Sequence, residues 1–123
     1  MNIKKLNNSV DMLKEYLGDS LLACDIWMTN TGQSIAGYNT QPKATALVEQ
    51  VTSFLKKALN GAGFPPLEKY YMLDCEGDSL ILVLQFEKYQ WGMLGSKSKT
   101  QLGLLLNVII PNVSEELLEA IKS

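Results

Sequence analysis

The chain has 123 residues and a mass of 13.6 kDa, the usual size of one domain, and hydrophobic residues make up 46% of it. Its 11 lysines and 13 acidic residues give a net charge of −2, which argues against nucleic-acid and anionic-membrane binders. Histidine and arginine are both absent, which excludes imidazole catalysis, histidine-bound zinc and arginine-based phosphate chemistry. We therefore expect a single domain over residues 1–123 that is not an enzyme and that has no catalytic residue, metal or cofactor.

The two cysteines, Cys24 and Cys75, both lie inside apolar runs. Two thiols form neither a disulfide framework nor, without histidine, a structural zinc site, so we expect reduced cysteines in the core. The N-terminus turns polar at once, and no apolar run approaches the ~20 residues that a membrane span needs. The sequence predicts a cytoplasmic protein without a membrane span.

The chain begins with a predicted helix and a predicted β-hairpin. Apolar residues recur at steps of three and four over residues 2–17, which is typical of an amphipathic helix. The stretch from Leu21 to Met28 is largely apolar on both alternating faces, with Leu22 among its covered residues, as in a strand covered on both sides. Residues 33–39 are shorter and contain glycine, which favours an edge strand.

A long helix and an amphipathic strand follow. Pro42 opens the helix at its first turn, and residues 69–75 alternate as a strand. The helix carries one wide apolar stripe, made of Ala44, Leu47, Val48, Val51, Phe54, Leu55, Ala58 and Leu59.

The last third predicts two more strands and a final helix. Residues 80–86 form a central strand, and a further strand begins at Tyr89. The run 102–110 has almost no polar face, so we expect a buried helix capped by Ser98 or Thr100. Pro111 should end or kink this helix, and a short helix over about 112–122, capped by Asn112, then becomes separable from it. The order α-ββ-α-βββ-α with short turns predicts an α/β (α+β) three-layer α/β/α sandwich around a five-stranded antiparallel sheet.

Four local patterns imitate catalytic or metal sites. The glycine-containing run 92–98 leads from a strand into a helix but lacks the Walker A spacing, and Ser96 with Lys99 imitates a Ser–Lys pair at a spacing that is frequent by chance. The carboxylates of residues 74–78 fail the calcium-loop spacing and fit a hairpin turn. Asp25 is a carboxylate inside an apolar strand, and we expect backbone groups or a lysine to satisfy it, because a catalytic acid would need a partner.

An exposed edge strand beside a wide apolar helix is an unstable surface for a monomer. We therefore predict a homodimer through the edge strand 69–75 and the helix 43–59. The predicted interface residues are Leu47, Val51, Phe54, Leu55, Tyr70, Tyr71, Met72, Leu73 and Asp74.

Two stretches of the sequence resemble the roadblock/dynein light chain family. The stretch 22–36, Leu-Ala-Cys-Asp-Ile-Trp-Met-Thr-Asn-Thr-Gly-Gln-Ser-Ile-Ala, is similar to the family's hairpin of an apolar strand, a polar turn with glycine and a Leu/Ile-Ala strand. The run Leu102-Gly103-Leu104-Leu105 is similar to the start of its final helix. With the order of elements, the resemblance covers roughly residues 2–110, and Pro111 departs from the family's usual continuous last helix.

The resemblance implies a roadblock-like fold, related to profilin and longin folds, with sheet order 2-1-5-4-3. Family members form homo- or heterodimers by joining their third strands into one sheet with the middle helices side by side. Many bind or regulate Ras-like small GTPases, others are subunits of motor or lysosomal scaffolds, and bacterial relatives include activators of a polarity GTPase. The resemblance thus implies a non-enzymatic dimeric scaffold or regulatory module that binds a Ras-like small GTPase or a multiprotein complex.

The alternative from another class is a small-ligand sensor of the PAS or GAF type, whose sandwiches hold ligands in the core. It requires a cavity near Trp27, Trp91 and the methionines. The sequence places no convergent set of polar residues there, which argues against it.

Overall fold

A computed structural model describes residues 1–123 and contains one five-stranded antiparallel sheet. The strands lie in the order β2-β1-β5-β4-β3, so the expected order is confirmed and β2 and β3 form the two edges. The hairpin β1–β2, the long crossover through a helix and the meander β3-β4-β5 follow the expected element order. The strands are β1 (Leu21–Met28), β2 (Ser34–Tyr38), β3 (Tyr70–Cys75), β4 (Ser79–Gln85) and β5 (Tyr89–Ser96).

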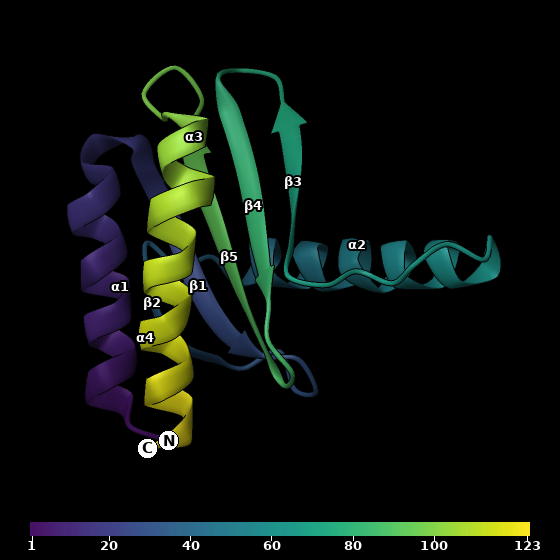
Figure 1. Ribbon diagram of the computed structural model, residues 1–123, viewed down its shortest axis with the longest axis horizontal. Helices are drawn as coiled ribbons and strands as arrows, with labels where there is room; N and C mark the ends of the chain where they lie inside the picture. Colours follow the sequence, from purple (N-terminus) through teal and green to yellow (C-terminus); the bar gives the residue numbers. More distant parts are fainter.

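One face of the sheet is covered by the N-terminal and C-terminal helices, which lie side by side (Figure 1). Helix α1 (Ile3–Leu17) begins where the Asn2 side chain accepts the Lys5 N–H at 3.2 Å. A 3₁₀ turn, η1 (Gly18–Ser20), leads into the sheet. The chain ends meet at the far end of this layer, where the Asn2 N–H donates to the Ala120 carbonyl at 2.9 Å. This layer and the sheet enclose the main core of 18 buried residues, among them Leu6, Leu13, Ile26 and Trp91.

The C-terminal helix runs through Pro111, so the expected break is wrong. It consists of α3 (Leu102–Leu104), the π-helical turn η2 (Leu105–Ile109) and α4 (Ile110–Lys122), in direct succession. The Ile110 N–H donates to the Leu105 carbonyl, five residues back. Proline cannot donate a helical hydrogen bond and its ring collides with the carbonyl four residues before it, and the wider π turn makes room for both effects.

Burial of the C-terminal helix also differs from the expectation. Leu102, Leu104 and Val108 are 41–48% exposed, because only the side that faces the sheet and α1 is covered. The side chains expected as caps bond elsewhere: helix α3 starts at Gln101 without a side-chain cap, and Thr100 Oγ1 donates to the Ser96 carbonyl at 2.6 Å.

Asn112 lies within α4 and does not cap a helix. Its Nδ2 donates to the Tyr16 hydroxyl at 2.9 Å and so links α4 to α1.

Leu22 is 45% exposed, which corrects its expected place on a covered face. The pairing of β1 with β5 shifts between Leu21 and Ala23, so Leu22 lies in an irregularity of the strand. Such an extra residue changes the alternation of the side chains, and Leu21 therefore shares the main core with Cys24 and Ile26.

Helix α2 (Pro42–Gly61) crosses the opposite face of the sheet and completes the three layers (Figure 1). Only Thr45, Val48 and Thr52 of this 20-residue helix are buried. The core beneath it is small and consists of Trp27, Val48 and Val83. Beyond β3 the helix continues past the edge of the sheet, and the chain then runs back along it to β3 (Figure 1). We call this projection, residues 53–69, the arm.

Candidate functional site

The outer edge of β3 carries unpaired backbone groups. The Lys69 carbonyl accepts the Gln85 N–H at 2.7 Å, and β3 pairs with β4 in an unbroken antiparallel register. Because hydrogen-bonded residues alternate along an antiparallel pair, Tyr71 and Leu73 bond to β4. The N–H and C=O groups of the intervening residues, Tyr70, Met72 and Asp74, therefore point outward from the sheet.

The residues predicted for a dimer interface all lie on β3 and on α2, two elements that meet at one edge of the molecule. Phe54 and Leu47 are 71% and 55% exposed, and Tyr70 and Asp74 are exposed on the edge strand. The remaining five, Val51, Leu55, Tyr71, Met72 and Leu73, are half-buried. The structure thus places the predicted residues on β3 and along α2, and Leu47 lies near the start of the helix, away from the edge strand.

A pair of hydroxyl groups fastens α2 to the edge strand just before the arm begins. The Tyr71 hydroxyl lies 2.6 Å from Thr52 Oγ1 and 3.5 Å from the Val48 carbonyl. Burial raises the pKa of Tyr71, and the hydrogen bond with Thr52 opposes that shift. The sequence gives no signal of this contact, because it depends on where α2 crosses the sheet.

A hollow of about 130 Å³ lies beside the first turns of α2. Most of its lining is apolar, from Ala44, Leu47 and Val48 of the helix and from three strands of the sheet. The sheet residues at its wall include Ala23, Ile81 and Leu94. The sheet surface next to α2 is therefore open and apolar at this depression, which we call the α2 hollow.

Asp25 lies at this hollow, and two hydroxyl groups bond to its carboxylate. The Ile26 backbone also bonds to it, so the expected backbone contribution is present, whereas no lysine takes part. Ser34 Oγ donates to Oδ1 at 2.5 Å and Thr45 Oγ1 donates to Oδ2 at 3.0 Å. Burial raises the pKa of Asp25, and both hydroxyl bonds act in the opposite direction. The three residues join β1, β2 and the first turn of α2, so the carboxylate fixes the start of that helix on the sheet.

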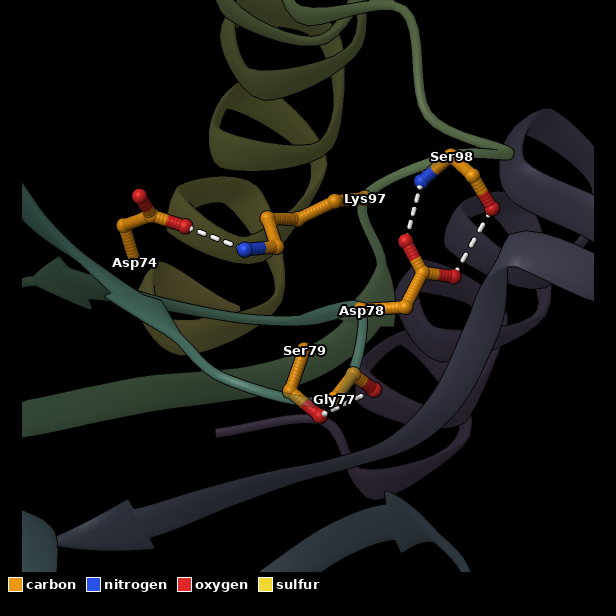
Figure 2. Close-up of polar contacts among 6 residues, drawn as sticks. All are labelled: Asp74, Gly77, Asp78, Ser79, Lys97 and Ser98. Carbon is orange, nitrogen blue, oxygen red and sulfur yellow. Dashed lines mark hydrogen bonds and ion pairs between the residues drawn. The ribbon is translucent and has the colours of Figure 1, made fainter.

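At the opposite end of the sheet Asp78 organises the loop between β5 and α3 (Figure 2). Its carboxylate accepts the Ser98 N–H and the Ser98 hydroxyl, each at 2.7 Å, and the Ser96 hydroxyl at 2.5 Å. These bonds lower the pKa of Asp78. Beside it, Lys97 Nζ lies 2.6 Å from Asp74 Oδ1. Residues 76–78 form the expected hairpin turn, with Gly77 and Asp78 at positive φ.

The polar residues of this loop support structure and do not assemble a reacting group. The Ser96 hydroxyl donates to Asp78 and not to Lys99, and the lowered pKa of Asp78 makes this carboxylate a weak base. No three of the Cys, Asp and Glu side chains gather where they could hold a metal ion. No helix of the structure is long and apolar enough to cross a bilayer.

The comparisons with known proteins agree on the fold. No protein-family model matches the sequence. No curated protein sequence matches it significantly. Among solved structures, MglB of Myxococcus xanthus superposes with a TM-score of 0.82 at 14% identity, over 98% of this chain and 90% of that one. The gliding protein MglB of Thermus thermophilus gives 0.75 at 14% identity, over 97% and 93%.

More distant structures have the same architecture. The roadblock/LC7 domain from Streptomyces avermitilis gives a TM-score of 0.62 at 11% identity, over 91% of this chain and 97% of that one. Profilin II of Acanthamoeba castellanii gives 0.57 at 15% identity, over 90% and 94%. The element order, the sheet order and these superpositions together show that the chain has the roadblock fold.

Proposed function

We propose that this protein is a non-enzymatic, dimeric scaffold or regulatory module of the cytoplasm that binds a Ras-like small GTPase or a multiprotein complex. The observation that carries the proposal is the open edge of β3 with the arm of α2 projecting beyond it. An unpaired strand edge and an apolar helix without a partner are both costly in water. A second copy covers both at once.

The surface of the chain has the size expected of a subunit that lacks its partner. Its accessible surface is 7447 Å², whereas a monomer of this mass is expected to expose about 6,600 Å². The excess of about 850 Å² is close to the ~800 Å² that each partner loses in a standard interface. The arm projects away from the sheet, and its exposed surface explains the excess accessible area.

A two-fold axis through Met72 pairs the two edges without altering either monomer. Met72 then faces its own copy and Tyr70 faces Asp74 of the second chain, and all three residues present outward N–H and C=O groups. The same axis lays each arm on the other subunit, over the half-face of the sheet that α2 leaves open. Each chain therefore supplies an apolar half-helix and receives one, as an isologous interface requires.

The GTPase part of the proposal rests on the resemblance of the sequence and on the fold of MglB, and is therefore an analogy. One of the similar structures is described as MglB with a tetrameric arrangement, so assembly is known for a protein of this fold. The absence of arginine here fits a regulator that acts by repositioning the GTPase's own groups.

The decisive test of the seam is Met72→Pro, with Met72→Ala as its control. Proline removes an outward N–H at the centre of the seam and leaves the bonds from β3 to β4 intact. Light scattering should show a dimer for the wild type and for Met72→Ala, and a folded monomer of half the mass for Met72→Pro. A dimeric Met72→Pro, or a wild type that is monomeric at ~100 μM, refutes the seam.

The partner is tested separately with purified Ras-like GTPases from the source genome, each loaded with GDP or with a GTP analogue. We expect one of them to bind the dimer in calorimetry and the protein alone to hydrolyse no nucleotide. If the wild type is dimeric but binds none of them, the scaffold function remains and the GTPase function is refuted.

The α2 hollow is the one observation in favour of the alternative, a small-ligand sensor. Trp27 lines it, but Trp91 lies fully buried in the core on the opposite face, so the cavity near both tryptophans that a sensor requires is not formed. Its one buried carboxylate, Asp25, already accepts two hydroxyl bonds. A melting temperature raised by a compound from the native cell extract would favour the sensor.

A further inference from the structure

We propose that Phe64 at the tip of each arm inserts into the α2 hollow of the second subunit, so that this hollow is a receptor site for an aromatic side chain of another copy. The inference rests on the proposed dimer and adds a specific contact to it. It assigns an occupant to the hollow and a role to an aromatic residue that the fold leaves in solvent.

Phe64 is held in place at the tip although its side chain is 65% exposed. Its N–H donates to the Leu59 carbonyl at 2.9 Å, and the Gly63 N–H donates to the Asn60 carbonyl at 3.2 Å. Gly63 has φ 74, a conformation that ends helices because it costs glycine little. The prolines that follow restrict the chain further. The backbone that carries the phenyl ring is thus fixed by the turn, so that binding has to order only the side chain.

The hollow has the size and chemistry for such a ring. Its volume of about 130 Å³ is close to the ~150 Å³ of an apolar protein cavity that takes up benzene. Leu47, which lines it, is 55% exposed. An aromatic ring placed there removes apolar surface of both copies from water.

The two-fold axis brings ring and hollow to the same place. Thr52 lies over β3, because its hydroxyl reaches Tyr71, and α2 continues for nine residues to Gly61. At 1.5 Å per residue, and with the seam half a strand spacing beyond β3, the tip lies about 11 Å past the seam. The hollow-lining residues Ala44 to Val48 lie about 11 Å before the seam by the same measure. The symmetry operation therefore brings the tip of one arm to the same distance from the seam as the hollow of the other subunit.

The helix also presents the correct side. Buried residues of α2 face the sheet at Thr45, Val48 and Thr52. Ala44 and Leu47, about a quarter-turn away, line the hollow, and Val51, Phe54 and Ala58 continue that side of the helix toward the tip. The second arm, running antiparallel, meets this flank along its length.

The dimer dissociation constant of Phe64→Ala tests the proposal, with Leu118→Ala as the control. Leu118 is also an exposed apolar residue, 41% exposed, but it lies on α4 in the opposite layer. Each dimer contains two Phe64 contacts, each worth a factor of at least about 10, so analytical ultracentrifugation should show a dissociation constant raised about 100-fold. Leu118→Ala should leave it within about threefold.

A disulfide-trapping experiment locates the contact directly. In a Cys75→Ser background, Phe64→Cys and Leu47→Cys are placed on separate chains and mixed. Mild oxidation should give a cross-linked heterodimer, whereas Leu118→Cys mixed with Leu47→Cys should give none.

The outcomes separate this inference from the seam. A dimeric wild type in which Phe64→Ala changes the dissociation constant by less than threefold, or in which the cross-link fails to form, overturns the Phe64 contact and leaves the seam standing. A monomeric wild type overturns both.

Discussion

The hydroxyl pair between Tyr71 and Thr52 gives the sharpest stability prediction, because it joins α2, at the base of the arm, to the edge strand through one short contact of 2.6 Å. Tyr71→Phe removes one hydroxyl and leaves Thr52, which is 3% exposed, without its partner. An unsatisfied buried hydroxyl costs about 1–3 kcal/mol. Thr52 can turn to the carbonyl of Val48, four residues earlier, so we expect a loss near the lower end, about 1–1.5 kcal/mol.

Thr52→Val is the mirror change and should cost a similar amount, because Tyr71 then retains only the Val48 carbonyl at 3.5 Å. The double variant leaves neither hydroxyl stranded. Replacing both partners by apolar groups of similar shape is nearly neutral. We therefore expect the double variant to lose less than about 1 kcal/mol, a coupling energy of about 1 kcal/mol or more.

Urea denaturation measures these values, and each single variant should lower the midpoint by about 0.5–1 M. All four proteins are compared at one concentration, because dimerisation adds to the apparent stability. If the losses of the two single variants add within about 0.3–0.5 kcal/mol in the double variant, the hydroxyls do not interact and the proposed anchorage of the arm is wrong.

Three further predictions concern single residues. Burial raises the pKa of Asp25 above its ordinary value of 3.8, so the contribution of Asp25 to stability is present below about pH 3.8 and is lost as the pH rises through the native pKa. Asp25→Asn should remove this pH dependence from urea midpoints measured between pH 3 and 7. The same variant should raise stability at pH 7. Asp78→Gly accommodates the φ of 61 at this position while removing the carboxylate. The Ser98 amide, which donates to Asp78 at 2.7 Å, should then exchange with deuterium faster than in the wild type. Unchanged exchange would contradict the role of Asp78 in ordering this loop. A Cβ at Gly37 would lie 2.4 Å from Thr40 Cγ2 and 2.6 Å from the Cys24 carbonyl, so Gly37→Ala should lower the free energy of unfolding by about 2 kcal/mol or more, whereas Gly61→Ala, with open space around it, should not.

The sheet could be predicted from the sequence because its signals are local. Alternation identified β3 and β5, runs that are apolar on both faces identified β1 and β4, and the shortness and glycine of β2 indicated an edge. The amphipathic pattern of residues 69–75 correctly indicated the open edge at β3. The wide apolar stripe of α2 correctly indicated more apolar surface than one sheet covers, since Phe54 and Leu47 remain largely exposed.

The remaining features depend on contacts between distant segments or on rare backbone geometry. Pro111 is a strong stop signal for an α-helix, and only the π turn before it lets the helix continue. Leu105, Ile109, Val113 and Leu117 are all buried although they repeat every four residues. In a plain α-helix that repeat drifts by about 40° per step, and the wider turn takes up part of the drift.

The hydrogen-bond partners of Asp25 and Tyr71 could not be predicted from the sequence either. Asp25 is satisfied by Ser34 and Thr45, which lie 9 and 20 residues away, and Tyr71 meets Thr52 across 19 residues. Hydroxyl side chains are too common for their pattern to identify such pairs. The α2 hollow likewise exists only because of the angle at which α2 crosses the sheet.

The closeness of the two chain ends makes circular permutation of this fold possible. Because Asn2 and Ala120 share a backbone hydrogen bond of 2.9 Å, a short glycine linker can join the termini, and new ends can be opened in the exposed turn at Gly61 to Gly63. In such a circular permutant the helix and the returning loop of the arm would become two free tails, each attached to an otherwise unchanged sheet. Whether these tails still associate with a second subunit would show how much of the arm's order comes from its own covalent turn and how much from the surface that receives it.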